Sequence, residues 1–390
     1  MDPRLLDYYS QELQYIREMG AEFAQEYPKI AARLALSGLE CADPYVERLL
    51  EGFAFLTARV QLRIDSEFPR FTQQLLNTVY PDYLCPMPSM IIAQVAPDLT
   101  EAGLAKGFEI ARGTALTAQR SLDAATSCEY RTAHALTLWP LRIAEASYRA
   151  YAGDFPPDLP LAKVPQAVLR LRIAASANLK LGQLALTSLP LYLAGPDNVA
   201  LRLYETLLTD AQGAFLSIPG ERKMIGPYLG REHVRELGFG DEEALLPAGP
   251  RTFQGHRLLQ EYLAFPARFL FVAITGLQRS LAHANIPEVE LTIPLAHHER
   301  MLEDSVSSDD FALHCVPAIN LFPKRADRIQ TDSPRAEYHV VPDRTRPMDF
   351  EVYQVRAVTG YGEGIEAQRE FMPFYASYDE RSDAQSDAYF

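Results

Sequence analysis

The segment FPARFLFVAITGL, residues 265–277, contains the feature that decides the fold of this chain. An apolar run of strand-forming residues follows a Pro and an Arg. Two later segments, CVPAINLF (residues 315–322) and VVPDRTRPMDF (residues 340–350), combine the same features. Such runs are typical of buried strands, and the adjacent Pro, Asn and Arg residues are typical of rigid corners. None of the segments has the shape of a catalytic motif, so they predict buried strands that lead into corners.

Strand-like patterns extend from this segment in both directions. Residues 169–173 and 289–293 alternate between aliphatic and polar side chains, which is typical of a strand with one solvent-exposed face. Residues 90–95 and 269–274 are more continuously apolar, and we expect strands buried on both faces there. Turn-forming clusters separate these runs at short intervals. The pattern predicts β-sandwich-like domains with a few inserted helices, rather than βαβ units.

The first part of the chain instead predicts helices. Asp2-Pro3 and Asp43-Pro44 each provide an N-cap followed by a proline at the first helical position. After each start, apolar residues recur at helical spacing, with charged residues on the opposite face. A third, shorter apolar stripe follows the second and stops at Tyr80.

Length and composition fit a folded protein of several domains. The chain has 390 residues, of which 48% are hydrophobic and 23% charged, and these fractions are ordinary for a globular protein. The patterns predict an α+β protein with a helical region over residues 1–85, a first β-rich domain over residues 86–250 and a second over residues 251–390. Residues 380–390 end on two aromatic side chains, and we expect the second β-rich domain to be truncated there.

Charge and cysteine content restrict the partners and the compartment. The formal net charge of −14 disfavours binding to nucleic acid or to an anionic membrane. Cys41, Cys85, Cys128 and Cys315 lie too far apart for a local zinc motif, and scattered thiols are typical of a reducing compartment. The sequence contains neither a signal-peptide pattern nor an apolar run long enough to cross a membrane. We therefore expect a cytoplasmic protein without cofactors and without direct membrane insertion.

Three groups of residues could carry chemistry, and each has a plainer structural interpretation. The His-His-Glu run at residues 297–299 could bind a metal, but adjacent His side chains point in different directions, which favours a solvated turn. His314 and Cys315 could form a base and a nucleophile, but their apolar neighbours favour an inert buried thiol. Residues 360–364 are glycine-rich without the spacing of a dinucleotide site, which favours a hairpin loop.

Two clusters of charge adjoin the apolar segments. Asp343, Arg344, Arg346 and Asp349 form a dense polar group, and Pro342 and Pro347 stiffen the two sides of the corner. The charged residues could form a carboxylate pair with Arg clamps, but a corner tied by Arg–Asp pairs is the favoured interpretation. Arg268 offers a similar choice, and an Arg beside apolar strand residues is usually a paired charge or lies with its stem on apolar surface.

In order and wording, the three apolar segments resemble the TssF family, also called VasA or ImpG. Its members are baseplate wedge subunits of the bacterial type VI secretion system. The resemblance covers the whole chain, although family members are longer, and it implies a structural component that is not an enzyme. It implies no catalytic residue and no cofactor. It implies a fold-setting role for the matching residues, which are Phe265, Pro266, Arg268, Cys315, Pro317, Asn320, Phe322, Pro342, Asp343, Arg344 and Pro347.

The resemblance also implies partners. In the family, two TssF copies and one TssG subunit form the core of a wedge, TssK and TssE attach to it, and the sheath, tube and spike assemble on the baseplate. The baseplate lies in the cytoplasm and docks at the inner-membrane complex. The N-terminal helices are the candidate contact, although their stripes could equally cover the chain's own core. The candidate residues are Leu5, Tyr9, Leu13, Ile16, Phe53, Leu56 and Val60. The alternative is a β-sandwich hydrolase or carbohydrate-binding protein with carboxylates in a cleft.

Overall fold

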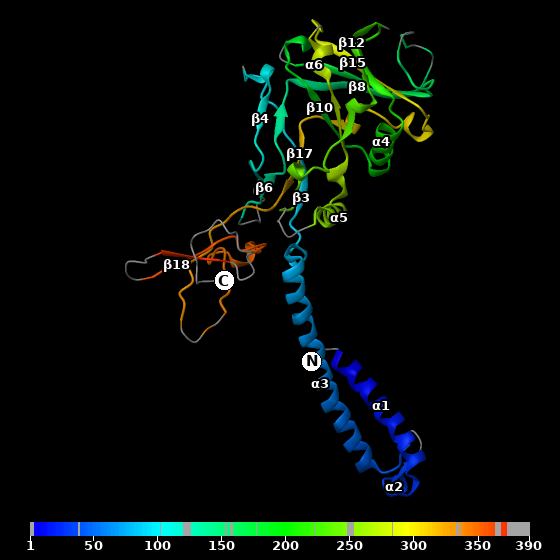
Figure 1. Cartoon of the computed structure of the whole chain (residues 1–390), viewed down its shortest axis with the longest axis vertical. Helices are drawn as coiled ribbons and strands as arrows, with labels where there is room; N and C mark the ends of the chain where they lie inside the picture. Colours follow the sequence, from blue (N-terminus) through cyan, green and yellow to red (C-terminus); the bar gives the residue numbers. More distant parts are fainter. Residues whose placement is uncertain are drawn as a thin grey trace. The chain divides into compact units, whose positions relative to one another are not determined.

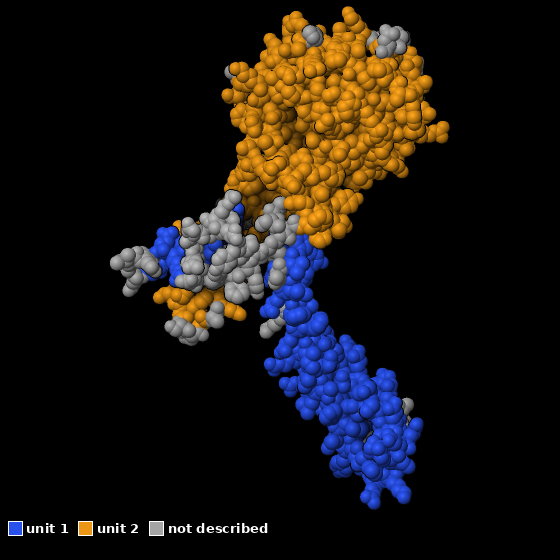
Figure 2. All heavy atoms as spheres, viewed as in Figure 1, with its two compact units in different colours: residues 1–85, 356–390 blue, residues 86–355 orange. Residues whose placement is uncertain are grey.

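The computed structural model describes residues 4–37, 40–101, 103–119, 126–151, 153, 155–156, 159–176, 178–221, 223–247, 253–282, 284–332, 335, 337–362 and 368–372. The expected truncation at residues 380–390 and part of the glycine-rich segment lie outside them. The chain divides into two compact units, residues 1–85 with 356–390 and residues 86–355 (Figure 2). The fold is α+β, as the sequence predicted.

The first unit contains a helical hairpin. The long helices α1 (Arg4–Glu26) and α3 (Pro44–Val79) lie side by side and antiparallel, joined through the short helix α2 (Pro28–Arg33) (Figure 1). Between α2 and α3, strand β1 (Leu36–Ser37) pairs with β2 (Glu40–Cys41). The hairpin therefore matches the helical region that the apolar periodicity predicted.

The helix ends follow local chemistry. The Asp43 carboxylate accepts a hydrogen bond from the backbone N–H of Tyr45 at 2.9 Å, and Pro44 occupies the first turn of α3. Pro28 ends α1 and begins α2. The third apolar stripe is not a separate element, because α3 continues through Pro69 as far as Val79. Its 36 residues span about 54 Å.

Two packed sheets form the main body of the second unit. A five-stranded antiparallel sheet has the order β12 (Met224–Gly230), β11 (Gly213–Ser217), β15 (Glu288–Leu295), β9 (Ala167–Ala175), β8 (Leu141–Ala150). A four-stranded sheet has the order β13 (Val234–Glu236), β14 (Phe271–Thr275), β10 (Ser188–Leu193), β16 (Phe311–Ala312). Helices α4 (Asp197–Thr209) and α6 (Leu277–Leu281) contribute side chains to the core between the sheets.

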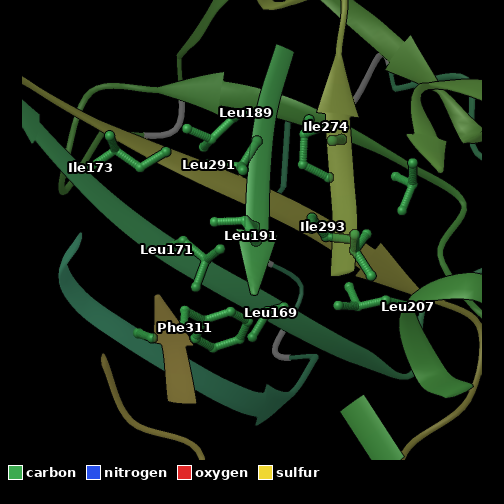
Figure 3. Close-up of a cluster of buried hydrophobic side chains, with 14 of the residues drawn as sticks. Leu169, Leu171, Ile173, Leu189, Leu191, Leu207, Ile274, Leu291, Ile293 and Phe311 are labelled. Carbon is green, nitrogen blue, oxygen red and sulfur yellow. The ribbon is translucent and has the colours of Figure 1, made fainter. Parts of the chain in front are cut away.

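The predicted alternation places the aliphatic side chains of both sheets in one core. Leu171 and Leu291 point from the five-stranded sheet toward Leu191 and Ile274 of the other sheet (Figure 3). Arg172 lies on the opposite, polar face of β9 and pairs with Glu145 at 3.0 Å. This confirms the sandwich and, for residues 169–173, the polar outer face that the sequence predicted. For residues 289–293 the expected solvent-exposed face is largely covered, because Thr292 is only 2% exposed and Glu290 is half-buried.

A third sheet contains the strand of the second apolar segment. Its order is β3 (Met90–Gln94), β17 (Cys315–Ile319), β6 (Glu129–Thr132), β5 (Ala115–Thr117), and a separate pair joins β4 (Phe108–Ile110) to β7 (Leu136–Leu138). All five residues of β17 are buried, as predicted. The strand over residues 90–95 is different, because four of its five assigned residues are only half-buried and the fifth is exposed.

The other two apolar segments differ from the expectation. In the first, the corner precedes the strand, because Pro266–Phe269 forms a turn of 3₁₀-helix after α5 (Gln254–Ala264) and strand β14 begins only at Phe271. In the third, residues 340–346 contain no strand, and a 3₁₀ turn covers Pro347–Asp349. The glycine-rich segment follows the favoured interpretation, since β18 (Val358–Tyr361) pairs with β19 (Gln368–Phe371) as a hairpin.

The sheets of the second unit contain strands from both sides of residue 250. Strands β14, β15 and β17 follow that residue, and each lies between two strands that precede it. Residues 86–355 accordingly form one compact unit, whereas the sequence predicted a division at residue 250. The boundary of the first unit at Cys85 coincides with the end of the predicted helical region.

Candidate partner-binding surface

The helical hairpin buries little of its own apolar surface. No residue of α1 is buried, and Ala54 and Ala58 alone are buried among the α3 side chains that the structure describes. The two helices contact each other through small residues and polar links. Tyr8 donates a hydrogen bond to Asp65 at 2.5 Å, and Arg17 pairs with Glu47 at 3.4 Å. Such a hairpin lacks the buried apolar stripe that usually stabilises surface helices.

A line of large apolar side chains instead lies on the exposed surface of α3. We name it the α3 outer stripe, and each member is more than half exposed. Its members are Tyr45, Leu49, Phe53, Leu56, Val60, Ile64, Phe68, Phe71, Leu75 and Val79. A continuous exposed apolar surface of this kind marks an interaction site on a soluble protein.

The spacing of the α3 outer stripe is an eleven-residue repeat. Leu49, Val60 and Phe71 are eleven residues apart, as are Ile64 and Leu75. Eleven residues make slightly more than three helical turns, so the repeat keeps the stripe close to one line along the helix axis. A partner helix can therefore lie along α3 over much of its length.

The structure separates the seven predicted contact residues into two groups. Leu5, Tyr9, Leu13 and Ile16 of α1 are half-buried, on a helix whose main neighbour is α3. The other three, Phe53, Leu56 and Val60, belong to the α3 outer stripe. The α3 residues are thus exposed in this structure, whereas those of α1 contribute mainly to the hairpin.

Arg268 of the first apolar segment is the centre of a buried ion-pair network. Its guanidinium contacts one carboxylate oxygen of Glu261, and Arg257 donates to the other oxygen at 3.1 Å. Arg268 also donates to the backbone carbonyls of Gly238 and Glu243. The side chains of Arg257, Glu261 and Arg268 are at most 1% exposed.

The network explains why the segment begins with the sequence Phe-Pro-Ala-Arg. Pro266 begins the 3₁₀ turn that directs Arg268 back toward α5, and half-buried Phe265 packs in a small core with Leu245 and Leu246. Burial is the main cause that lowers the pKa of Arg268 to about 10; Arg257 lowers it further and Glu243 raises it. Arg268 remains a cation at neutral pH and ties α5 to the segment before it. Sequence reasoning missed Glu261, although its spacing of four residues from Arg257 was a signal of an ion pair.

The second segment continues from buried strand to corner as predicted. Cys315 and Pro317 lie in β17, where the Pro317 carbonyl accepts a hydrogen bond from the backbone N–H of Ala133. Asn320 then donates its side-chain amide to the Glu129 carbonyl at 3.1 Å, which fixes the corner. Phe322 is half-buried, and its ring makes an edge contact with Phe350 at 6.5 Å.

The third segment forms a surface corner. Arg344 donates its backbone N–H to Asp327 at 2.7 Å, and its side chain donates to the Arg328 carbonyl. Asp343 accepts from Thr345 and lies 3.5 Å from Lys324. The hydrogen bond from the Thr345 side chain is the largest cause that lowers the pKa of Asp343. The Arg–Asp interpretation therefore applies, but the partners come from residues 324–328, which the sequence did not single out.

The two prolines and the two remaining charged residues of this corner also contribute to its structure. Pro342 and Pro347 flank the turn, and Pro347 begins the following 3₁₀ turn. Arg346 donates to the Thr126 hydroxyl at 3.0 Å, and this hydroxyl donates to Asp349. The cluster links neighbouring loops at the surface, and this geometry is structural.

The remaining residues that could have carried chemistry lie in surroundings that fit a structural role. Burial raises the pKa of the Cys315 thiol to about 12, so it stays protonated at neutral pH. Burial lowers the pKa of His314 to about 4, and its Nε2 accepts a hydrogen bond from the backbone N–H of Trp139 at 3.2 Å. His297 pairs with Asp210 at 2.6 Å, whereas His298 pairs with Glu303 at 3.5 Å.

Within the described residues, no three His, Cys, Asp or Glu side chains gather closely enough to hold a metal ion. Over the same part of the chain, no helix combines the length and the apolar character needed to cross a lipid bilayer.

Comparison with known proteins decides the family. The model of a family described as "Type VI secretion system, TssF" matches residues 1–390. The chain belongs to this family. A curated relative, type VI secretion system component TssF1 of Pseudomonas aeruginosa, is 51% identical over 394 residues, which cover 100% of this chain and 62% of that protein. This chain therefore spans less than two thirds of the relative's length.

Solved structures include similar chains. One belongs to a TssK-TssF-TssG baseplate subcomplex of the type VI secretion system, studied by cryo-electron microscopy. It is 30% identical, with a TM-score of 0.66, and the match covers 84% of this chain and 58% of that one. A chain from the baseplate complex of the type VI secretion system is also 30% identical, with a TM-score of 0.42 over 84% of this chain and 54% of that one.

Proposed function

We propose that this chain is a structural subunit of a type VI secretion baseplate and that the α3 outer stripe is its contact with a neighbouring subunit. The stripe itself carries the proposal, because many large apolar side chains lie exposed on a helix that buries only small ones. Membership of the TssF family supports the choice of the type VI secretion baseplate, and the solved relative belongs to a TssK-TssF-TssG subcomplex.

We further propose the identity of the neighbours. TssG binds along the α3 outer stripe, with a second copy of this chain on TssG, and TssK and TssE attach to the same wedge. An eleven-residue repeat supports a helical partner, because it presents a nearly straight apolar line to a second helix. Sheath, tube and spike proteins assemble on the completed baseplate, which lies in the cytoplasm and docks at the inner-membrane complex.

The proposed role is mechanical and includes no catalytic step. The chain holds subunits in place through its interfaces. The hydrolase or carbohydrate-binding alternative required carboxylates with shifted pKa values in a cleft. Asp98, which is exposed, and Asp343, which is half-buried, have lowered pKa values, and in each case the hydrogen bond from a Thr side chain is the largest cause. These two carboxylates give that alternative no support.

Co-expression with TssG and mass measurement of the intact complex tests the proposal. We expect two copies of this chain for each TssG. The double variant Phe53→Glu and Val60→Glu places charge on the stripe, and we expect the recovery of the complex to fall by about tenfold or more. Recovery of an unchanged complex by this variant, or after deletion of residues 1–80, contradicts the assignment.

The matched control is Val164→Glu. Val164 is an apolar residue of the second unit with 80% exposure, and it lies outside the stripe. We expect this variant to recover the complex like the unsubstituted chain. Far-UV circular dichroism of each variant verifies that the helices are retained.

A further inference from the structure

Helix α5 is amphipathic, but its charged side chains face the protein interior and its large apolar side chains face outward. Its buried residues are charged, Arg257 and Glu261, whereas Leu259, Tyr262 and Leu263 are between 56% and 74% exposed. A surface helix normally turns its apolar face toward the core and its charges toward water. The reversal indicates that the outward face of α5 has a use outside this chain.

The buried network prevents α5 from turning its apolar face inward. Glu261 accepts hydrogen bonds from Arg257 and from the backbone N–H of Leu246 at 3.0 Å, and it also contacts Arg268. Rotation of the helix would separate these groups while they remain buried, and an unpaired buried charge is strongly unfavourable. The leucines therefore stay on the surface.

Aromatic side chains enlarge the outward face. The ring of Tyr262 lies 5.9 Å from that of Phe269, which in turn lies 4.9 Å from Phe239. Phe253, at the start of the helix, is 70% exposed. We name the exposed members the α5 patch, which consists of Phe239, Phe253, Leu259, Tyr262 and Leu263. Exposed large apolar side chains gathered around one helix in this way mark a binding site.

The border of the α5 patch is acidic. Asp241 lies beside α5, because it accepts a hydrogen bond from Arg257 at 3.1 Å while its side chain stays 64% exposed. Glu242 is 97% exposed, and it pairs with Arg112 at 3.4 Å on the surface, where such a pair is weak. A partner that covers the patch therefore meets negative charge at the edge.

We propose that the α5 patch binds an amphipathic helix of a partner protein, whose apolar side chains cover the patch and whose Lys or Arg side chains meet Asp241 and Glu242. Helix-on-helix packing suits an exposed row of Leu and Tyr side chains. Charge complementarity selects a basic partner. A second copy of this chain would bring a second acidic border against the first, and such like charges repel.

The probes for this proposal are two synthetic helices of about 20 residues, long enough to be helical in water. Both carry the same Leu stripe, bordered by Lys in one peptide and by Glu in the other. Fluorescence anisotropy measures their binding to the whole chain, and hydrogen exchange locates it. We expect the Lys peptide to bind about tenfold more tightly than the Glu peptide, with protection of the amides of residues 254–264.

Three variants separate the α5 patch from the α3 outer stripe. Leu263→Glu should weaken binding of the Lys peptide by about tenfold. Its matched control, Leu56→Glu on α3, should leave the protection of α5 unchanged. Glu242→Lys should reduce the preference for the Lys peptide. Both Leu positions are exposed, so the variants should fold, and circular dichroism verifies this.

Four results would overturn the proposal. They are equal binding of the two peptides, unchanged binding by the Leu263→Glu chain, absence of binding by either peptide, and a dimer of the unsubstituted chain that Leu263→Glu dissociates. The last result would make a second copy the occupant. None of these measurements uses TssG, so failure here is distinct from failure of the proposed baseplate role.

Discussion

Glu261 lies between two buried guanidinium groups, those of Arg257 and Arg268, and contacts both. Removal of one member of a buried ion pair leaves charge without a partner and typically costs about 3–5 kcal/mol. We expect Glu261→Gln to lower the free energy of unfolding of the second unit by this amount. Urea unfolding followed by fluorescence of Trp139, the sole Trp in the sequence and 8% exposed, measures it.

The control for this prediction is Glu205→Gln on α4. Glu205 pairs with Arg202 at 2.8 Å, and both side chains are more than half exposed. Exposed pairs contribute at most about 1 kcal/mol. A Glu261→Gln chain that is no less stable than the Glu205→Gln chain would show that the buried network adds nothing to folding.

His314 should make the second unit sensitive to acid. Burial lowers its pKa from 6.5 to about 4. Between these two pH values, His314 is therefore protonated in the unfolded chain but remains neutral in the folded chain. Stability therefore falls as the pH falls through this window and levels off below pH 4. Between pH 7 and pH 5 the loss is about 2 kcal/mol.

Substitution of His314 by Asn tests this origin of the acid sensitivity. Asn tolerates the positive φ of 57° at this position and does not titrate, so the Trp139 fluorescence assay should show a smaller loss between pH 7 and pH 5. His339→Asn, at an exposed position, should behave like the unsubstituted chain. Equal losses in the His314→Asn and unsubstituted chains would exclude His314 as the cause.

At the scale of residues, the sequence identified positions better than partners. Arg268, Asn320 and Arg344 were expected at corners, and each donates a side-chain hydrogen bond to a backbone carbonyl. Glu261 and Asp327 were missed, because a tertiary ion pair depends on which loops meet, and periodicity reports only which residues share a face. Assignment of the thiol of Cys315 to the core succeeded because its neighbours were apolar on both sides.

At the scale of elements, the close approach of α1 and α3 depends on small side chains. Ala58 is fully buried between the helices of the hairpin. We expect Ala58→Leu to separate them and to destabilise the hairpin by about 1–3 kcal/mol. Hydrogen exchange of the amides of residues 44–65 measures the change.

Gly52→Leu introduces the same side chain into the same helix. A Cβ at Gly52 meets no atom within 4 Å, and Leu forms helix better than Gly. We expect this variant to be at least as stable as the unsubstituted hairpin. Comparable destabilisation by both substitutions would mean that the Ala58 site has no particular packing requirement.

The prediction of helices and strands succeeded where the apolar residues followed a single period. It failed where local turn-forming residues and the apolar pattern pointed to different structures. The caps at Asp43 and Pro44 and the alternation over residues 169–173 gave correct elements. The sequence suggested a separate third apolar stripe that stops at Tyr80, but α3 continues through Pro69 as far as Val79, because a long helix can lose one hydrogen bond. Residues 340–346 are apolar at their start, yet no neighbouring strand supplies a ladder for them, within the part of the chain described.

At the scale of the whole molecule, the second unit should behave as one body. A protease site inserted between residues 248 and 252 tests this, because strands on both sides of the cut share sheets. We expect the two fragments to stay together during size-exclusion chromatography without denaturant.

Separate elution of the two fragments after cleavage near residue 250 would restore the division that the sequence predicted. That prediction rested on composition and turn signals, which mark loops but not the sheet each strand enters. Sheet membership is decided by contacts between residues far apart in sequence, and a single sequence does not report these.

The pairing of β3 with β17 has a consequence for the growing chain on the ribosome. Residues 90–94 emerge early, but their ladder partner, residues 315–319, is made much later. The third sheet must therefore close after most of this chain has been translated, and β3 needs protection from wrong pairing until then. Strand β3 is therefore the first strand of the second unit to be synthesised, but one of the last to pair.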